Sequence, residues 1–196
     1  MNELDDLNQK NLFKKHLITE QSISKIKDNY SIDFLSYFDN IKFSECVKLT
    51  LIKSRSNNDS NEVAVVFNAD SQAVIYGDEH SVDVDSNYLA RDIIKFSKST
   101  VILCHNHPSL QTFSLDDLRY FFINKNIKVF CVVSNLGVVE ILYRAKDLDL
   151  VKERNILIKM KELTDSRFVN SVKDEYNLAR DILKILSKYN YYRRLS

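Results

Sequence analysis

Glycine and proline are scarce in this chain of 196 residues, which holds two glycines and one proline. Asparagine, aspartate and serine must therefore make most of its tight turns. Cysteine is scarce as well, and Cys46, Cys104 and Cys131 are odd in number and lie in apolar stretches. They predict buried free thiols in a reducing compartment rather than a disulfide framework.

Long apolar runs and a strong excess of one charge are also missing. No apolar stretch approaches the length of a membrane span, and the first residues lack the basic and apolar segments of a secretion signal. We therefore expect a cytoplasmic protein with no membrane partner. The formal net charge of +1 argues against a general nucleic-acid binder. A local basic face is still compatible with that charge, so contact with nucleic acid stays open but unsupported.

The sequence does contain enough apolar residues for a packed core, with 44% hydrophobic residues against 28% charged ones. The hydrophobic pattern predicts strands over residues 43–54, 62–68, 73–76, 101–104, 127–133 and 138–142. Strands 62–68 and 73–76 are expected to form one hairpin, and strands 127–133 and 138–142 another. Helical spacing predicts helices within residues 1–42 (including 31–38), over 87–97, 114–124 and 176–192, and from 147 onward. This order favours an α/β fold, in which helices flank a mixed β-sheet.

The same pattern divides the chain into three parts. We expect a domain over residues 43–145 to carry the sheet, between a helical N-terminal extension at 1–42 and a helical C-terminal extension at 146–196. The helical extensions could support a homodimer. The last residues, from Tyr191 to Arg194, are expected to be a frayed end.

The chemistry of the chain is concentrated where the apolar strand 101–104 runs into His105, Asn106 and His107. Side chains at i and i+2 of an extended segment point the same way, so both imidazoles can reach one ion. Neutral imidazole is the commonest side-chain ligand of zinc, and catalytic zinc sites keep three protein ligands and one open position. Pro108 ends the strand, and a helix that starts at Ser114 would turn Asp117 back toward the histidines. The sequence therefore predicts a zinc site formed by His105, His107 and Asp117.

This arrangement resembles the JAMM motif of the JAB/MPN metallopeptidases, which pairs an upstream glutamate with His-x-His-Pro, serine and aspartate. The sequence His-Asn-His-Pro-Ser at residues 105–109 is most similar to that of bacterial RadC-type and phage-associated JAB domains. The resemblance implies a cytidine-deaminase-like α/β fold in which His105, His107 and Asp117 bind Zn²⁺. It also implies that Glu62 acts as general base and acid, that Ser114 helps to stabilise the oxyanion, and that the substrate is a protein or peptide. Residues 109–113 form a shorter loop than the usual family pattern.

Each of these residues also has a simpler interpretation. Ser114 and Asp117 have the spacing of a helix capping box, which is compatible with a ligand role because a capped helix start would hold the carboxylate still. Glu62 could be an ordinary glutamate at the end of a strand. Glu79 is a rival for the base and His80 a rival ligand, both in a polar turn.

Two neighbours of the motif are expected to take no part in the chemistry. Cys104 should point to the side of the strand opposite His105 and act as a core thiol. Asp116 should face solvent in the first turn of its helix, where a negative charge favours the helix dipole. The hypothesis is a zinc-dependent hydrolase of a peptide or isopeptide bond. The alternative is a RadC-like module that acts by binding in DNA repair or mobile-element biology.

Overall fold

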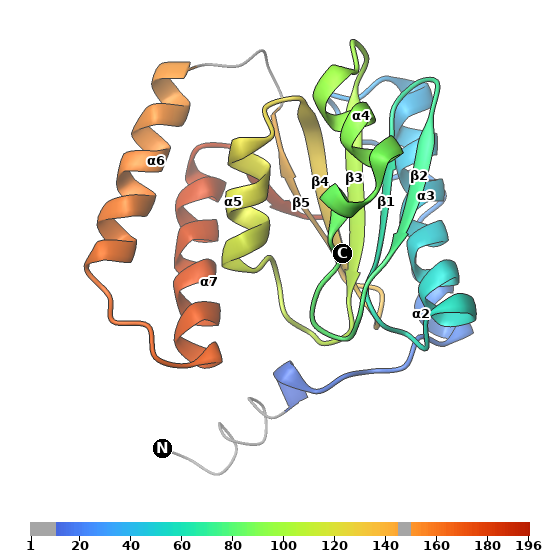
Figure 1. The fold of residues 1–196 in the computed structure, drawn as a ribbon, viewed down its shortest axis with the longest axis horizontal. Coiled ribbons are helices and arrows are strands. Elements are labelled where there is room, and N and C mark those ends of the chain that lie inside the picture. Colours follow the sequence, from blue (N-terminus) through green and yellow to red (C-terminus); the bar gives the residue numbers. More distant parts are fainter. Residues whose placement is uncertain (1–10, 145–149) are drawn as a thin grey trace.

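The computed structural model describes residues 11–144 and 150–196 and has a mixed α/β architecture (Figure 1). The predicted fold class, a mixed sheet flanked by helices, is confirmed at that level. The helices are α2 (Glu20–Ser24), α3 (Tyr37–Asn57), α4 (Tyr88–Phe96), α5 (Leu115–Ile123), α6 (Leu150–Asp165) and α7 (Val172–Lys188), with a 3-10 turn η1 (Val84–Ser86). The strands are β1 (Val63–Phe67), β2 (Gln72–Tyr76), β3 (Val101–His107), β4 (Ile127–Ser134), β5 (Val139–Tyr143) and β6 (Tyr192–Arg194).

These strands form one sheet in the order β2-β1-β3-β4-β5-β6. β3 and β4 are parallel and are joined through α5, whereas all other neighbours are antiparallel. The two hairpins, β1–β2 and β4–β5, were both predicted from the sequence. The start of α5 therefore lies near the C-terminal end of β3. The predicted site residues of these two elements lie there.

The sheet separates two apolar cores. One face packs against α4, α5, α6 and α7, and the other packs against α2 and α3 (Figure 1). Along β3 the side chains alternate: Val101 and Leu103 belong to the first core, and Ile102 and Cys104 belong to the second. All three cysteines are buried and free, as predicted.

The segment 43–54 was predicted as a strand, and this prediction is wrong because the segment lies inside α3. Phe43, Val47 and Leu51 recur every four residues and are fully buried on one side of the helix. Ser36 caps its N-terminus by accepting a hydrogen bond from the Asp39 amide, so the short helix predicted over 31–38 is replaced by this cap and the first turn of α3.

The C-terminal end also differs from the prediction. The last helix runs over Val172–Lys188 rather than 176–192, and residues 192–194 form β6 on the edge of the sheet. The expected frayed end is therefore wrong. Asn190 takes a positive φ of 59° and makes the tight turn between α7 and β6, a conformation that asparagine tolerates better than most residues. The helical segments predicted within 1–10 and at 147–149 lie outside the described residues.

Candidate metal centre

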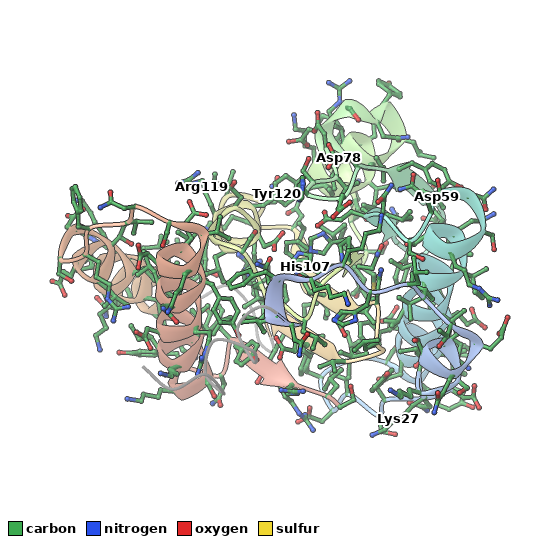
Figure 2. All side chains as sticks on the ribbon, turned by 90° about the horizontal axis from the view of Figure 1, so that it is seen from below. Lys27, Asp59, Asp78, His107, Arg119 and Tyr120 are labelled. Atoms are coloured by element: carbon green, nitrogen blue, oxygen red, sulfur yellow. The ribbon has the colours of Figure 1, made fainter. Side chains whose placement is uncertain are left out.

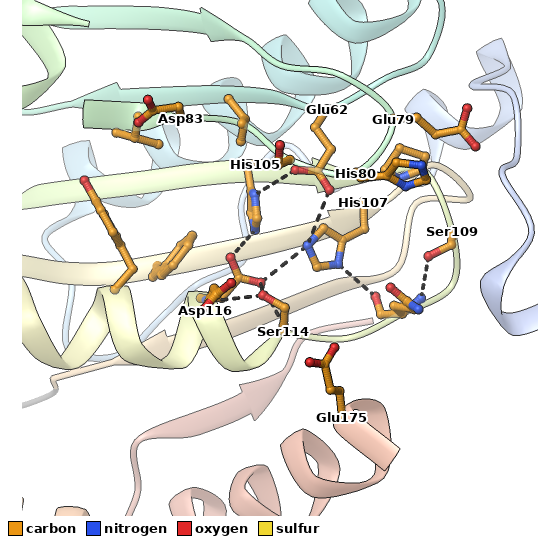
Figure 3. Close-up of a pocket in the computed structure, with 18 of the residues that line it drawn as sticks. Glu62, Glu79, His80, Asp83, His105, His107, Ser109, Ser114, Asp116 and Glu175 are labelled. Carbon is orange, nitrogen blue, oxygen red and sulfur yellow. Dashed lines mark hydrogen bonds and ion pairs between the residues drawn. The ribbon is translucent and has the colours of Figure 1, made fainter. Parts of the chain in front are cut away.

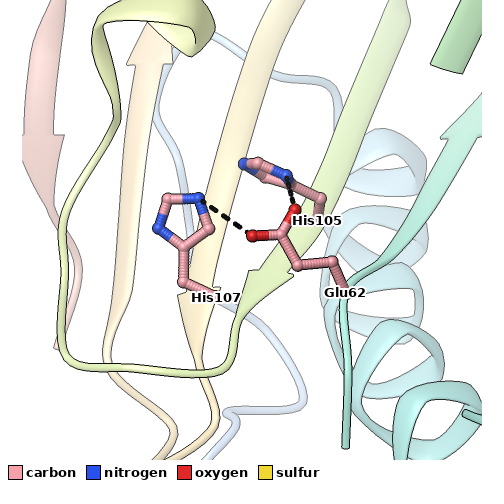
Figure 4. Close-up of side chains that lie close together, drawn as sticks. All are labelled: Glu62, His105 and His107. Atoms are coloured by element: carbon pink, nitrogen blue, oxygen red, sulfur yellow. Dashed lines mark ion pairs between the residues drawn. The ribbon is translucent and has the colours of Figure 1, made fainter. Parts of the chain in front are cut away.

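The two histidines lie at the C-terminal end of β3 and extend from the same face of the strand. His105 and His107 follow Leu103 on the side of the sheet that faces α5, and their ring centroids are 4.7 Å apart (Figure 4). Both side chains are more than nine-tenths buried. Cys104 lies in the core on the opposite face, as predicted. The spacing argument from the sequence is therefore correct in that both imidazoles face the same small volume.

Asp117 reaches this volume from the first turn of α5. The Ser114 hydroxyl accepts a hydrogen bond from the Asp117 amide at 3.0 Å, and Asp117 Oδ2 accepts from the Ser114 amide and hydroxyl at 2.8 Å each. The predicted capping box is thus confirmed. The box holds the carboxylate with Oδ1 3.3 Å from His105 Nε2 and Oδ2 3.4 Å from His107 Nε2 (Figure 3).

Glu62 lies directly before β1 and enters the site from the neighbouring strand. Its Oε2 is 3.9 Å from His105 Nδ1, and its Oε1 is 3.9 Å from His107 Nε2 (Figure 4). One ligand atom from each of Glu62, His105 and His107 lies within 4.8 Å of the others. A buried group of two imidazoles and a carboxylate could therefore hold a metal ion, whose identity the geometry leaves open.

The backbone around Glu62 is fixed by an asparagine that the sequence analysis gave no role. Asn106 lies between the two histidines but points to the opposite face, where it is fully buried. Its Oδ1 accepts from the Val63 amide at 2.8 Å, and its Nδ2 donates to the Asn61 carbonyl at 3.1 Å. Because these are the residues on either side of Glu62, β3 itself sets where the glutamate stands. The only signal in the sequence was an amide side chain in an otherwise apolar strand.

The ring nitrogens are arranged as in a metal site. His107 Nδ1 is 3.3 Å from the carbonyl oxygen of Gln111, which accepts when Nδ1 carries the proton. That tautomer leaves the lone pair of Nε2 facing Asp117 and Glu62. His105 Nε2 is buried and has no hydrogen-bond partner among the described residues, although it is aimed at Asp117. A buried nitrogen without a partner is costly unless something binds it, so these donors fit a cation between them.

Burial and mutual charge shift the pKa of every member of this group. Burial lowers the pKa of His105 to about 4 and raises that of Glu62 to about 8. Burial also opposes the charged forms of His107 and Asp117, but their hydrogen bond and mutual attraction outweigh it. The pKa of His107 is raised to about 9, and that of Asp117 lies well below its usual range. Without an ion, the group is held by opposite charges at distances longer than a good hydrogen bond.

The site lies at the bottom of a cavity of about 730 Å³. In Figure 2, His107 is labelled near the centre of the molecule. Glu79 and His80, the rivals considered for base and ligand, line the cavity but are exposed. Glu79 is 3.6 Å from Lys15, and the metal-capable group found among the described residues contains Glu62, His105 and His107 but not Glu79, His80 or Asp117. Asp116 faces solvent, as predicted, with 88% of its side chain exposed.

One wall of the cavity comes from the N-terminal segment, in which the sequence showed no chemistry. The His16 amide donates to the Pro108 carbonyl at 2.8 Å, and the Leu110 amide donates to the Leu12 carbonyl at 3.1 Å. These bonds place Phe13 beside the loop that leaves β3, where it lines the cavity. Contacts between segments so distant in sequence leave no local pattern by which they could be predicted.

Comparison of the chain with models of protein families, with curated proteins and with solved structures finds no match. The family resemblance therefore depends on the motif residues alone. Within residues 11–144 and 150–196, none of the helices has both the length and the apolar content to cross a membrane.

Proposed function

We propose that this chain is a zinc-dependent hydrolase of the JAB/MPN type that cleaves a peptide or isopeptide bond. The observation that carries the proposal is the convergence of Asp117 on the Nε2 atoms of both histidines, at 3.3 and 3.4 Å. In a tetrahedral site with metal–ligand bonds of about 2.0–2.1 Å, neighbouring donor atoms are about 3.3 Å apart. Each Asp117 oxygen therefore lies about as far from its histidine nitrogen as two ligands of one small cation lie from each other.

The distances also favour separate roles for the two carboxylates. We assign His105, His107 and Asp117 as the ligands. Glu62, with its oxygens 3.9 Å from the nearest ring nitrogens, lies further from the histidines than Asp117 does, at 3.3 and 3.4 Å. It is instead near enough to bond a small molecule held next to His107. The proposal is also supported by the fold, because the connection from β3 through α5 places Asp117 next to the two histidines.

In the mechanism, bound zinc would lower the pKa of a water molecule and polarise the substrate carbonyl. Glu62 would accept a proton, through one carboxylate oxygen, from the water whose oxygen attacks the carbonyl carbon. It then returns the proton to the leaving nitrogen as the C–N bond breaks. Glu62 therefore acts as base and then as acid, with no net gain of protons.

Ser114 has a more specific position than the family resemblance implies. Its hydroxyl donates to Asp117 Oδ2 and accepts from the Asp117 amide, so both partners belong to the capping box. In this state Ser114 orients a ligand. Help with the oxyanion requires its hydroxyl proton to turn from Asp117 toward the substrate when that charge develops.

The test is metal analysis of the purified protein together with hydrolysis of peptide and isopeptide substrates. We expect one zinc per chain, loss of zinc in His107→Gln and Asp117→Asn, and full zinc with no turnover in Glu62→Gln. Retained hydrolysis in Glu62→Gln would remove its role as base. Absence of zinc in the wild-type protein would instead favour a buried ionic network in a binding module, the alternative that the RadC-type resemblance raises.

A further inference from the structure

The rim of the cavity is strongly acidic, unlike the chain as a whole. Five exposed carboxylates surround the opening above the histidines, and we call them the acidic rim: Glu79, Asp83, Asp85, Asp116 and Glu175. They come from the segment between β2 and α4, from α5 and from α7 (Figure 3). The formal net charge of the chain is +1, so the positive charge that balances them lies elsewhere on the molecule.

Little of this charge is neutralised locally. Among the described residues that line the cavity, Lys15 is the only lysine or arginine, and it pairs with Glu79. Arg119 pairs with Asp116 at 2.9 Å from outside the cavity. Asp83, Asp85 and Glu175 make no ion pair with any described residue, and Asp85 Oδ1 accepts a neutral hydrogen bond from the Tyr120 hydroxyl at 3.0 Å. Their field adds up at the opening, because the low-dielectric walls of a cleft focus it.

Helix capping explains part of this pattern but not all of it. Asp116 and Glu175 lie in the first turns of α5 and α7, and Asp83 caps η1, all places where a carboxylate is favoured. Capping does not require these three starts to face one cavity. Asp85 likewise lies in the first turn of η1, whereas Glu79 begins no helix.

An independent observation shows that the cavity is built to receive a ligand. His105, 4% exposed, lines this cavity, and its Nε2 makes no hydrogen bond with any described residue, although Asp117 Oδ1 lies 3.3 Å away. Apolar and aromatic side chains also line the cavity, including Phe13, Val82, Tyr120, Phe130 and Val172. A chain that enters would thus contact carboxylates, apolar surface and the buried donors of one cavity.

We infer that the substrate segment bound in this cleft is cationic, a peptide that carries lysine or arginine side chains on either side of the bond held above the histidines. This inference rests on the proposed function for the position of the scissile bond. The acidic rim pairs with the basic side chains, and their aliphatic stems pack on the apolar walls, as long cationic side chains do elsewhere. Acidic peptides are excluded by repulsion from the same carboxylates.

The experiment measures binding without turnover. Fluorescein-labelled peptides of equal length, in which alanine alternates with lysine, glutamate or serine, are titrated against Glu62→Gln protein, with added zinc and again with chelator. A rim variant adds Asp83→Asn, Asp85→Asn and Glu175→Gln, which keep the cap and hydrogen-bonding shapes. A matched control variant instead adds Glu45→Gln, Asp70→Asn and Glu162→Gln, exposed carboxylates outside the cavity that remove the same charge.

We expect the lysine peptide to bind more tightly than the other two and to bind about tenfold more weakly to the rim variant, the sum of three exposed charge pairs. The control variant should bind as tightly as its parent, and added salt should weaken the lysine peptide selectively. Equal binding of the three peptides, or equal loss in the control variant, would overturn the inference. The hydrolase proposal is judged separately by zinc content and turnover, so a failure of one is distinguishable from a failure of the other.

Discussion

Two buried ionic groups in this protein are organised in opposite ways. Arg144 donates from Nε to Glu153 at 2.8 Å, and its other nitrogens donate to the carbonyls of Ile127 and Phe121 at 2.7 and 3.0 Å. Lys125 also pairs with Glu153. The group at His105, His107, Asp117 and Glu62 is as deeply buried, yet its closest ion-pair distances are 3.3–3.9 Å and one nitrogen has no partner.

The difference indicates which group is structural and which is meant to bind. A buried ion pair is stable only if its remaining donors and acceptors are satisfied, and the Arg144 group meets that condition. It holds the start of α6 against the last turn of α5 and the start of β4. The histidine group is held by its flanks, through the Ser114 cap and Asn106, while the space between its donors is left open. Rigid support around loosely spaced donors is the arrangement expected of a preorganised metal site.

The largest change in stability is expected from breaking the fully hydrogen-bonded group around Arg144 and Glu153. Glu153→Gln removes the counter-charge of a guanidinium that is 5% exposed, and we expect the free energy of unfolding to fall by about 3–5 kcal/mol. Urea denaturation measures the loss. Asp165→Asn breaks the exposed pair with Lys161 and should cost less than about 1 kcal/mol. Equal losses in the two variants would mean that closure of the buried group does not stabilise the fold.

The next largest effect is expected from binding of zinc between the histidines and Asp117. Zinc at about 100 times its Kd should stabilise the folded protein by about 2.7 kcal/mol, because the unfolded chain lacks the site. For a chain of this size that corresponds to a rise in Tm of about 5–10 °C, which chelator should reverse. Thermal scans of wild-type and His107→Gln protein measure it. A similar rise in His107→Gln would show that zinc binds elsewhere.

The elements that could be predicted from the sequence are those specified by residues close together in the chain. The end of β3 at Pro108, the cap at Ser114 and both hairpins have short-range signals, and the structure has them where the sequence predicts them. The i, i+2 spacing of His105 and His107 was sufficient to place them on one face. The position of Asp117 followed from the helix start predicted at Ser114, whereas that of Glu62 followed from a motif resemblance rather than from periodicity.

The failures have a common physical cause, which is burial decided by distant segments. α3 has a mixed pattern because Asn40, Ser44, Thr50 and Ser54 are buried on it along with apolar residues. The buried Ser54 hydroxyl donates to the nearby Asn61 carbonyl and accepts from Asn106, which lies 52 residues further along the chain. β6 likewise exists only through its pairing with β5. Neither network is visible in a short window of sequence.

The smallest effect tests whether the flank of the open group positions a ligand. Ser114→Ala removes the cap of α5 and should cost about 1 kcal/mol of unfolding free energy in chelator. It also frees the Asp117 carboxylate, so the zinc affinity measured by calorimetric titration should fall by about 10- to 100-fold. Ser171→Ala, which removes the equivalent cap of α7, should cost similar stability and leave zinc affinity unchanged, and Ser114→Thr should restore both quantities. If Ser114→Ala instead bound zinc as tightly as the wild type, the capping box would be a feature of the helix alone, and the preorganisation of the site would have to come from β3 and Asn106.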